Sequence, residues 1–218
     1  MQATRRPRVK ICCIASLAEA RLAISYGASA LGLVSRMPSG PGVISEEQIT
    51  EIAATIPPGV ASFLLTCEQN PNDIIAQQKR CRTNTLQLVD CLTHGSHDDL
   101  RNALPGIGIV QVIHVVGPES VEEACAIAPH VDAILLDSGN PSLQVKELGG
   151  TGRRHDWALS RQIRERVQLP IFLAGGLNSS NVKQAIEEVS PFGLDICTGV
   201  RTNGHLDEAK LNALFSAL

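Results

Sequence analysis

The sequence predicts a single domain over residues 1–218, folded as a (β/α)8 or TIM barrel of eight parallel strands and eight helices. Three observations support this prediction. Short apolar runs recur eight times along the chain, segments with helical spacing lie between them, and several of those segments begin with capping residues. No linker or low-complexity stretch divides the chain. Such an alternation is typical of parallel sheets covered by helices.

The apolar runs that we expect to form strands are mostly ~21–31 residues apart, about the length of one strand-helix-strand unit. They are continuous rather than alternating, as in strands that are buried on both faces. An open, doubly wound sheet would show the same runs, because eight strands do not by themselves require closure. The expected strands are residues 9–12, 30–34, 61–65, 85–89, 109–115, 133–137, 171–174 and 193–198.

The segments between these runs carry apolar residues three or four positions apart, so each can cover the sheet with one apolar stripe. The stripes are Leu17/Ala20/Ile24, Ile49/Ile52/Ile56, Leu159/Ile163/Val167, Val182/Ile186/Val189 and Leu211/Leu214/Phe215/Leu218. Three helix starts match the capping box, in which two residues each accept, through the side chain, a hydrogen bond from the free backbone amide of the other. These are Ser16 with Glu19, Ser45 with Gln48, and Ser120 with Glu123.

The composition is that of a water-soluble domain, with 44% hydrophobic and 19% charged residues and a net charge of −3. No run approaches the ~18 apolar residues of a membrane span, so we expect no membrane association. The slight acidity and the 3% of aromatic residues give no support for nucleic-acid binding. The seven cysteines show neither CxxC pairing nor zinc spacing, which favours a reducing, cytoplasmic location.

Polar residues at the carboxyl ends of the expected strands are the first candidates for function, because barrels build their active sites there. The first run ends at Cys12, the sixth ends at Asp137, and Arg36 follows the second. Strand alternation places Cys12 on the interior face together with Lys10, if Ile11 points outward to the helices. Each candidate has an ordinary alternative, since a strand-end aspartate can cap a helix and a buried cysteine can be a small apolar residue.

Two glycine turns follow the seventh and eighth expected strands, at Gly175-Gly176 and Thr198-Gly199. Barrels frequently bind phosphate in this position, because glycine lets the backbone approach the ligand and helix N-termini attract anions. The alternative is that the glycines only turn a tight corner. We expect a phosphate group to bind between the two turns.

Several motifs together resemble the phosphoribosylanthranilate isomerase family, whose members are (β/α)8 enzymes of tryptophan biosynthesis. The match extends over nearly the whole chain, and its most specific parts are GGTGRRHDW (149–157) and LAGGLNSSNV (173–182). The other matching stretches are VKICCIAS (9–16), ISEEQ (44–48), LQLVD (86–90), ILLDS (134–138) and DICTGV (195–200).

The resemblance implies an Amadori rearrangement of N-(5'-phosphoribosyl)anthranilate without a cofactor or metal. It implies Asp137 as the acid that opens the ribose ring and Cys12 as the base that removes the C2' proton. The base role needs a thiol whose pKa is lowered by its site. The expected contacts to the phosphosugar come from Gly175, Gly176, Asp195, Cys197, Thr198 and Gly199.

The chain also departs from the family's motifs. Cys13 stands where the family has glycine after the catalytic cysteine, and the segment 37–45 lacks the Ser-Pro-Arg whose arginine pairs with the anthranilate carboxylate. Val89-Asp90 replaces His-Gly, and Arg201 replaces a glutamate.

Two interpretations of these departures stay open. In one, the protein is a working isomerase, a monomer or a homodimer, in which another arginine binds the carboxylate, the candidates being Arg36, Arg153, Arg154 and Arg201. In the other, the barrel has diverged to another phosphorylated substrate or to binding without turnover.

Overall fold

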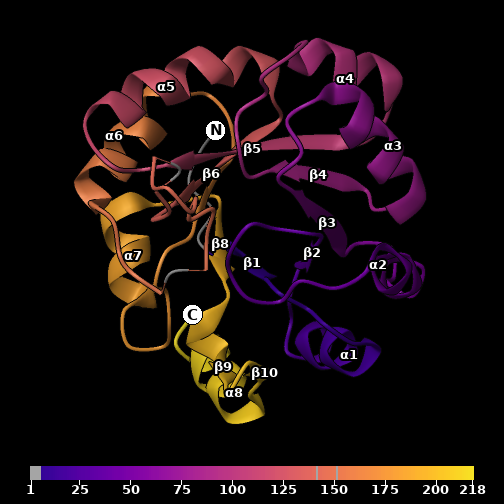
Figure 1. Ribbon diagram of the computed structural model, residues 1–218. Coiled ribbons are helices and arrows are strands. Elements are labelled where there is room, and N and C mark those ends of the chain that lie inside the picture. Colours follow the sequence, from indigo (N-terminus) through magenta and orange to yellow (C-terminus); the bar gives the residue numbers. More distant parts are fainter. Residues whose placement is uncertain (1–5, 141, 151) are drawn as a thin grey trace.

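The computed structural model describes residues 6–140, 142–150 and 152–218, and it contains a closed barrel of eight parallel strands in sequential order (Figure 1). The strands are β1 Arg8–Ile11, β2 Ala30–Val34, β3 Ala61–Thr66, β4 Thr85–Leu88, β5 Gly108–His114, β6 Ala133–Asp137, β7 Ile171–Leu173 and β8 Gly193–Ile196. The predicted (β/α)8 fold is therefore confirmed. Every strand lies within a few residues of its expected position.

Barrel closure depends on the pairing of the first strand with the last. β1 pairs with β8 in parallel, with Lys10 opposite Asp195 and Ile11 opposite Ile196. The amide of Cys12 continues the ladder by donating to the carbonyl of Ile196 at 2.8 Å. An open, doubly wound sheet is thus excluded.

Helices surround the strands on the outside of the barrel (Figure 1). They are α1 Leu17–Ser25, α2 Glu46–Ala53, α3 Pro71–Cys81, α4 His97–Ala103, α5 Glu119–Ile127, α6 Trp157–Arg166, α7 Val182–Val189 and α8 Glu208–Ser216. Two 3-10 turns, η1 Ala128–His130 and η2 Thr198–Val200, and a small hairpin of β9 Arg201–Thr202 and β10 His205–Leu206 complete the elements. The hairpin lies next to α8 (Figure 1), and Lys210 of α8 donates to the carbonyl of Arg201 at 2.6 Å.

The three expected capping boxes have three different outcomes. Ser45 and Gln48 form the complete box at the start of α2. At the start of α1 the Ser16 side chain accepts from the amide of Glu19. The Glu19 carboxylate accepts from the amide of Ala15 instead of that of Ser16, so only half of this box is present. The prediction for Ser120 is wrong, because α5 begins at Glu119 after Pro118 and Ser120 donates to the carbonyl of His114 instead. Proline suits a helix start since its fixed φ is already helical.

Alternation along the strands divides the core into two parts. The outward residues, such as Ile11, Leu31 and Leu64, pack with the helices. The inward residues, such as Cys12 and Phe63, form a separate cluster inside the barrel. The expected orientation of β1, with Cys12 inside and Ile11 outside, follows from this division.

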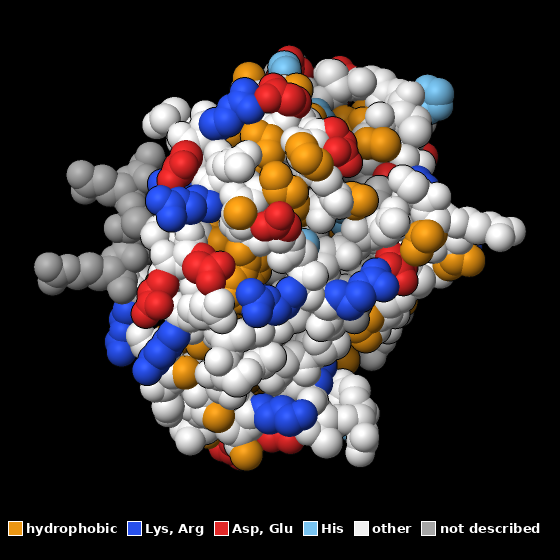
Figure 2. Space-filling model, turned by 90° about the vertical axis from the view of Figure 1, so that its left-hand side faces the viewer, with side chains coloured by type: hydrophobic (Ala, Val, Ile, Leu, Met, Phe, Trp, Pro, Cys, Tyr) orange, Lys and Arg blue, Asp and Glu red, His pale blue; other side chains and the backbone are white. Residues whose placement is uncertain are grey.

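The outer surface over α5, α6 and α7 carries acidic and basic side chains that are interspersed around a few apolar ones (Figure 2). Arg161 pairs with Glu165 along α6, and Arg166 at the end of α6 reaches Glu122 on α5. These exposed pairs contribute little to stability individually. Among the described residues, no helix is both long and apolar enough to cross a membrane.

Candidate functional site

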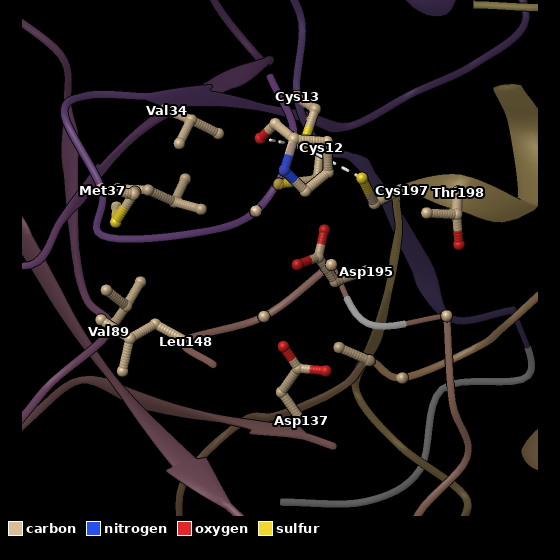
Figure 3. Close-up of a pocket in the computed structure, with 18 of the residues that line it drawn as sticks. Cys12, Cys13, Val34, Met37, Val89, Asp137, Leu148, Asp195, Cys197 and Thr198 are labelled. Carbon is tan, nitrogen blue, oxygen red and sulfur yellow. Dashed lines mark hydrogen bonds between the residues drawn. The ribbon is translucent and has the colours of Figure 1, made fainter. Parts of the chain in front are cut away.

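A cavity opens at the carboxyl ends of the strands and brings most of the expected site residues together (Figure 3). The expected residues that line it are Cys12, Asp137, Gly175, Gly176, Asp195, Cys197 and Thr198. Loops after β2 and β6 also line it, and they leave about 60 Å³ of free space. Cys12 and Asp137, from strands on different sides of the barrel, thus face one common space.

Cys12 lies at the bottom of this cavity with 5% of its surface exposed. Below it, the fully buried ammonium of Lys10 pairs with the carboxylate of Asp195 at 2.9 Å. The adjacent Cys13 thiol and the charge of Lys10 lower the pKa of the Cys12 thiol against the opposing effect of burial. This shift is in the direction that a thiol acting as a base requires.

The Lys10–Asp195 pair is a charged pair in the barrel interior. Burial opposes the charge of Lys10, but the attraction of Asp195 outweighs it and raises the pKa of Lys10. Burial also raises the pKa of Asp195, although the ammonium beside it favours the carboxylate. Asp195 also lines the cavity, and its expected contact with the phosphosugar stays a prediction.

Asp137 ends β6 and is enclosed by its own loop. The amide of Ser138 donates to its carboxylate at 2.7 Å. Gly149 approaches so closely that a Cβ there would lie 2.7 Å from the other carboxylate oxygen. Glycine at position 149 therefore lets the loop after β6 pack against the acid without displacing it.

The glycine turn after β7 has a backbone conformation that favours glycine, as the sequence predicted. Gly175 and Gly176 have φ angles of +83° and +63°, in the left-handed region. Side-chain amides of Asn178 and Asn181 both donate to the Gly176 carbonyl, at 3.3 and 2.9 Å. These bonds fix the turn just before α7.

Gly199 does not line the cavity but lies behind it, against the β7 turn. A Cβ at this position would be 1.9 Å from the carbonyl oxygen of Leu177. Glycine is therefore required for close packing of the two turns. The expected phosphate contact from Gly199 stays a prediction.

The opposite end of the cavity is apolar and was not predicted from the sequence. Val34, Met37, Val89 and Leu148 lie together in Figure 3, away from Cys197 and Thr198, and Leu65 completes the group. Val34, Leu65 and Val89 alternate inward along their strands, so strand parity could have indicated them. Met37 and Leu148 come from loops, whose course the pattern does not predict.

The arginines proposed as carboxylate partners do not line the cavity. Arg154 stacks on the ring of Trp157, with 3.7 Å between the guanidinium carbon and the ring centroid. Arg153 pairs with Glu147. Arg36 is exposed in the loop after β2, directly before Met37.

Arg201 is a clear correction. Its side chain is only 6% exposed, and its guanidinium donates to Glu19 at 3.0 Å and to the carbonyls of Cys12 and Cys13 at 3.0 and 2.6 Å. With these bonds made inside the protein, Arg201 is not available to a substrate carboxylate. Among the described residues, neither lysine nor arginine lines the cavity.

Comparison with known proteins gives a consistent result. Residues 9–217 match the model of the family described as N-(5'-phosphoribosyl)anthranilate (PRA) isomerase. An N-(5'-phosphoribosyl)anthranilate isomerase of Methanocella arvoryzae is 33% identical over 209 residues, with 94% of this chain and 93% of that protein covered. Isomerase 2 of Methanosarcina mazei is 34% identical over 94% of this chain and 90% of its own length.

Solved structures of the same kind superpose on the whole barrel. The phosphoribosyl anthranilate isomerase of Thermotoga maritima has a TM-score of 0.80 at 29% identity and covers 97% of this chain and 98% of its own. Another phosphoribosyl anthranilate isomerase, in complex with reduced 1-(o-carboxyphenylamino)-1-deoxyribulose 5-phosphate, has a TM-score of 0.78 at 27% identity, with 97% and 98% covered.

Proposed function

The chain belongs to the N-(5'-phosphoribosyl)anthranilate isomerase family, and from this premise we propose that its cavity isomerises N-(5'-phosphoribosyl)anthranilate in tryptophan biosynthesis. Cys12 acts as the general base and Asp137 as the general acid. The observation that carries the proposal is the two-ended cavity, with an apolar end, a glycine-lined end and both reactive groups between them.

The two ends of the cavity suit the two ends of the substrate. The related enzyme complex holds a ligand with a carboxyphenyl group at one end and a phosphate at the other. Here the aromatic ring lies against Met37, Val89 and Leu148, because apolar side chains favour burial of an apolar ring. The phosphate lies at Gly175, Gly176 and Thr198, where open backbone and the start of a helix favour an anion.

The reaction needs one proton donated and one removed. Asp137 in its protonated form gives its proton to the ribose ring oxygen, the C1'–O bond breaks, and the nitrogen lone pair forms a Schiff base at C1'. The Cys12 thiolate then takes the C2' proton, and the electron pair of that bond moves toward the nitrogen. The resulting enolamine tautomerises to the ketone of the product, as C1' takes up a proton and the C2' hydroxyl loses one.

The carboxylate of the anthranilate ring needs a cation outside the cavity lining. Arg36 is our candidate, because it directly precedes Met37 at the apolar end and its guanidinium is exposed. A guanidinium can hold a carboxylate through two parallel hydrogen bonds.

Growth of a tryptophan auxotroph that lacks the isomerase tests the activity. We expect the wild-type chain to restore growth without tryptophan and Asp137→Asn, expressed at the same soluble level, to fail. No growth with soluble wild-type protein would overturn the proposed activity.

A further inference from the structure

Cys13 and Cys197 lie just after β1 and β8, the two strands whose pairing closes the barrel. The Cys197 thiol donates to the Cys13 sulfur at 3.0 Å, as a dashed line in Figure 3 marks. Both side chains line the cavity, and all seven cysteines of the chain have free thiols. Two free thiols that are 184 positions apart in the sequence thus meet where the barrel closes.

The backbone of Cys13 makes this contact possible. Along a regular strand Cys12 and Cys13 would point to opposite faces, but both line the cavity. The φ angle of Cys13 is +63°, in the left-handed region, so the strand geometry of β1 does not continue through this residue. A residue with a Cβ is strained in this conformation and needs surroundings that hold it.

The surroundings of Cys13 hold both its backbone and its side chain. The guanidinium of Arg201 donates to the Cys13 carbonyl at 2.6 Å. The Cys13 thiol donates to the carbonyl of Pro41 at 3.5 Å. A Cβ at Gly42 would lie only 2.4 Å from the Cβ of Cys13. The loop after β2 therefore packs closely against Cys13 and keeps its sulfur beside Cys197.

We propose that Cys13 and Cys197 are a site of reversible oxidation, at which a hydroperoxide converts the two thiols to a disulfide that joins β1 to β8. A disulfide bond is about 2.05 Å long, so the two sulfurs have to approach by only about 1 Å more. Disulfides in a reducing cytosol are as a rule transient and redox-sensing, which suits a pair that is free in the resting protein. The inference goes beyond the proposed isomerase activity and does not depend on it.

Hydrogen peroxide is small enough for the cavity, whose free space of about 60 Å³ exceeds the ~30 Å³ that one water molecule occupies. Cys197 is the more exposed of the pair, and its sulfur attacks one peroxide oxygen. The S–O bond forms, the O–O bond breaks, and the leaving hydroxide takes the thiol proton to become water.

The second step uses the contact between the two sulfurs. The Cys13 sulfur attacks the sulfur of the Cys197 sulfenic acid, the S–S bond forms, and the S–O bond breaks. The hydroxide leaves as water with the proton of the Cys13 thiol. Two thiols are thus oxidised to one disulfide while one peroxide is reduced to two waters, and a dithiol such as dithiothreitol reverses the change.

The bond would change how the barrel is closed. Backbone hydrogen bonds hold β1 to β8, and the last of them runs from the Cys12 amide to the Ile196 carbonyl at 2.8 Å. A disulfide directly beyond this bond would join the first and last strands covalently. It would also restrict the unfolded chain, because it closes a very long loop. The oxidised protein should therefore resist unfolding more than the reduced protein.

The test treats the full-length protein with dilute hydrogen peroxide, blocks the remaining thiols with iodoacetamide and maps the tryptic peptides by mass spectrometry without reduction. Trypsin releases Cys12 and Cys13 in residues 11–21 and Cys197 in residues 184–201. Fragmentation between Cys12 and Cys13 shows which of the two is linked. Melting temperatures are measured for the oxidised protein and for the same sample after dithiothreitol.

We expect the two peptides to be linked through Cys13 and Cys197 in most of the wild-type protein, with Cys12 alkylated. Cys12→Ser should keep the link, and Cys13→Ser and Cys197→Ser should each lose it. Oxidation should raise the melting temperature of the wild type by roughly 4 °C or more, and dithiothreitol should reverse the rise. Cys91→Ser, at an exposed position after β4, is the matched control and should behave as the wild type.

A link from Cys197 to Cys12, or a Cys197 oxidised without any link, would overturn the inference. A mapped Cys13–Cys197 bond without a rise in melting temperature would overturn its role in joining β1 to β8. The comparison of oxidised with reduced wild type needs no substitution, so a variant that folds poorly does not affect it. An inactive wild type would contradict the proposed function and leave these results unchanged.

Discussion

At the scale of single residues, the site combines buried groups whose ionisation is set by a few neighbours. Lys10 and Cys13 favour the thiolate of Cys12, and the desolvation of the barrel interior opposes it. His155, in the loop after β6, is another buried group whose ionisation is set by its surroundings. Burial lowers the pKa of His155 to about 4, so the ring is neutral near pH 7. It donates to or accepts from the Ser160 hydroxyl at 2.6 Å and lies close to Gly175.

His155 predicts a dependence of stability on pH. The pKa of His155 in the folded protein lies below the ordinary value of 6.5, so the unfolded chain binds the proton first as the pH falls. Stability from a neutral His155 is complete above pH 6.5 and is lost progressively down to about pH 4. His155→Gln should remove this contribution, on the order of 3 kcal/mol, from the pH dependence of the unfolding free energy.

Urea unfolding of both proteins at several pH values between 4 and 7 measures the difference. All other histidines are shared by the two proteins, so their effects cancel. Parallel stability curves would show that His155 is protonated in the folded state as readily as in the unfolded chain.

At the scale of elements, the glycine turns after β7 and β8 depend on each other. Gly176 is fixed by two asparagine amides before α7, and Gly199 in η2 packs directly on the Leu177 carbonyl. The two turns therefore pack directly against each other. The proposed phosphate site is thus built jointly by two strand-helix connections.

Gly199→Ala should separate the two turns and weaken phosphate binding. A Cβ 1.9 Å from the Leu177 oxygen forces the backbone to shift. We expect at least about tenfold weaker binding of a phosphosugar, with no change for its dephosphorylated analogue. Titration calorimetry measures both ligands.

Gly108→Ala, at the start of β5, serves as the control. A Cβ at position 108 would make only ordinary contacts of 3.6 Å with Thr85. Equal weakening of both ligands in Gly199→Ala would mean that the turns do not bind the phosphate.

Element positions could be predicted from the sequence because they depend on local patterns. Apolar runs located all eight strands, and strand parity placed Cys12 inside the barrel and Ile11 outside. The error at Ser120 arose because a capping-box pattern occurred inside a helix that Pro118 starts.

The partners of site residues could be predicted less well, because they depend on contacts between distant parts of the chain. Arg201 is one of four arginines that the sequence offers as partners for the substrate carboxylate, yet in the structure it binds Glu19, which is 182 positions away in the sequence. The apolar end of the cavity includes Met37 and Leu148, which loops bring to the barrel. No periodicity in the sequence encodes such loop positions.

At the scale of the whole molecule, the barrel is closed beside a buried ion pair. Lys10 and Asp195 are opposite one another in the register of β1 and β8, and both point into the barrel. The same pair lies beneath Cys12. Two residues of the pairing between β1 and β8, which closes the barrel, therefore also set the charge around the proposed base. Stability and activity are therefore coupled at this seam.

Lys10→Met should destabilise the barrel by roughly 3–5 kcal/mol, because it leaves a buried carboxylate without its partner. Adding Asp195→Asn removes the unpaired charge and should restore part of the lost stability. Urea unfolding of the wild type, the single variant and the double variant measures this. A double variant no more stable than Lys10→Met would show that the unpaired charge is not the cause.

Single-turnover isomerisation of N-(5'-phosphoribosyl)anthranilate tests the assignment of Cys12 and Asp137 most directly. Wild type should convert the substrate, and Cys12→Ser and Asp137→Asn should each lose about 100- to 10,000-fold in rate. Both variants should bind the substrate nearly as well as the wild type, because the two groups act on the transition state. A wild type that binds without converting, or an Asp137→Asn variant that converts at the wild-type rate, would contradict the account.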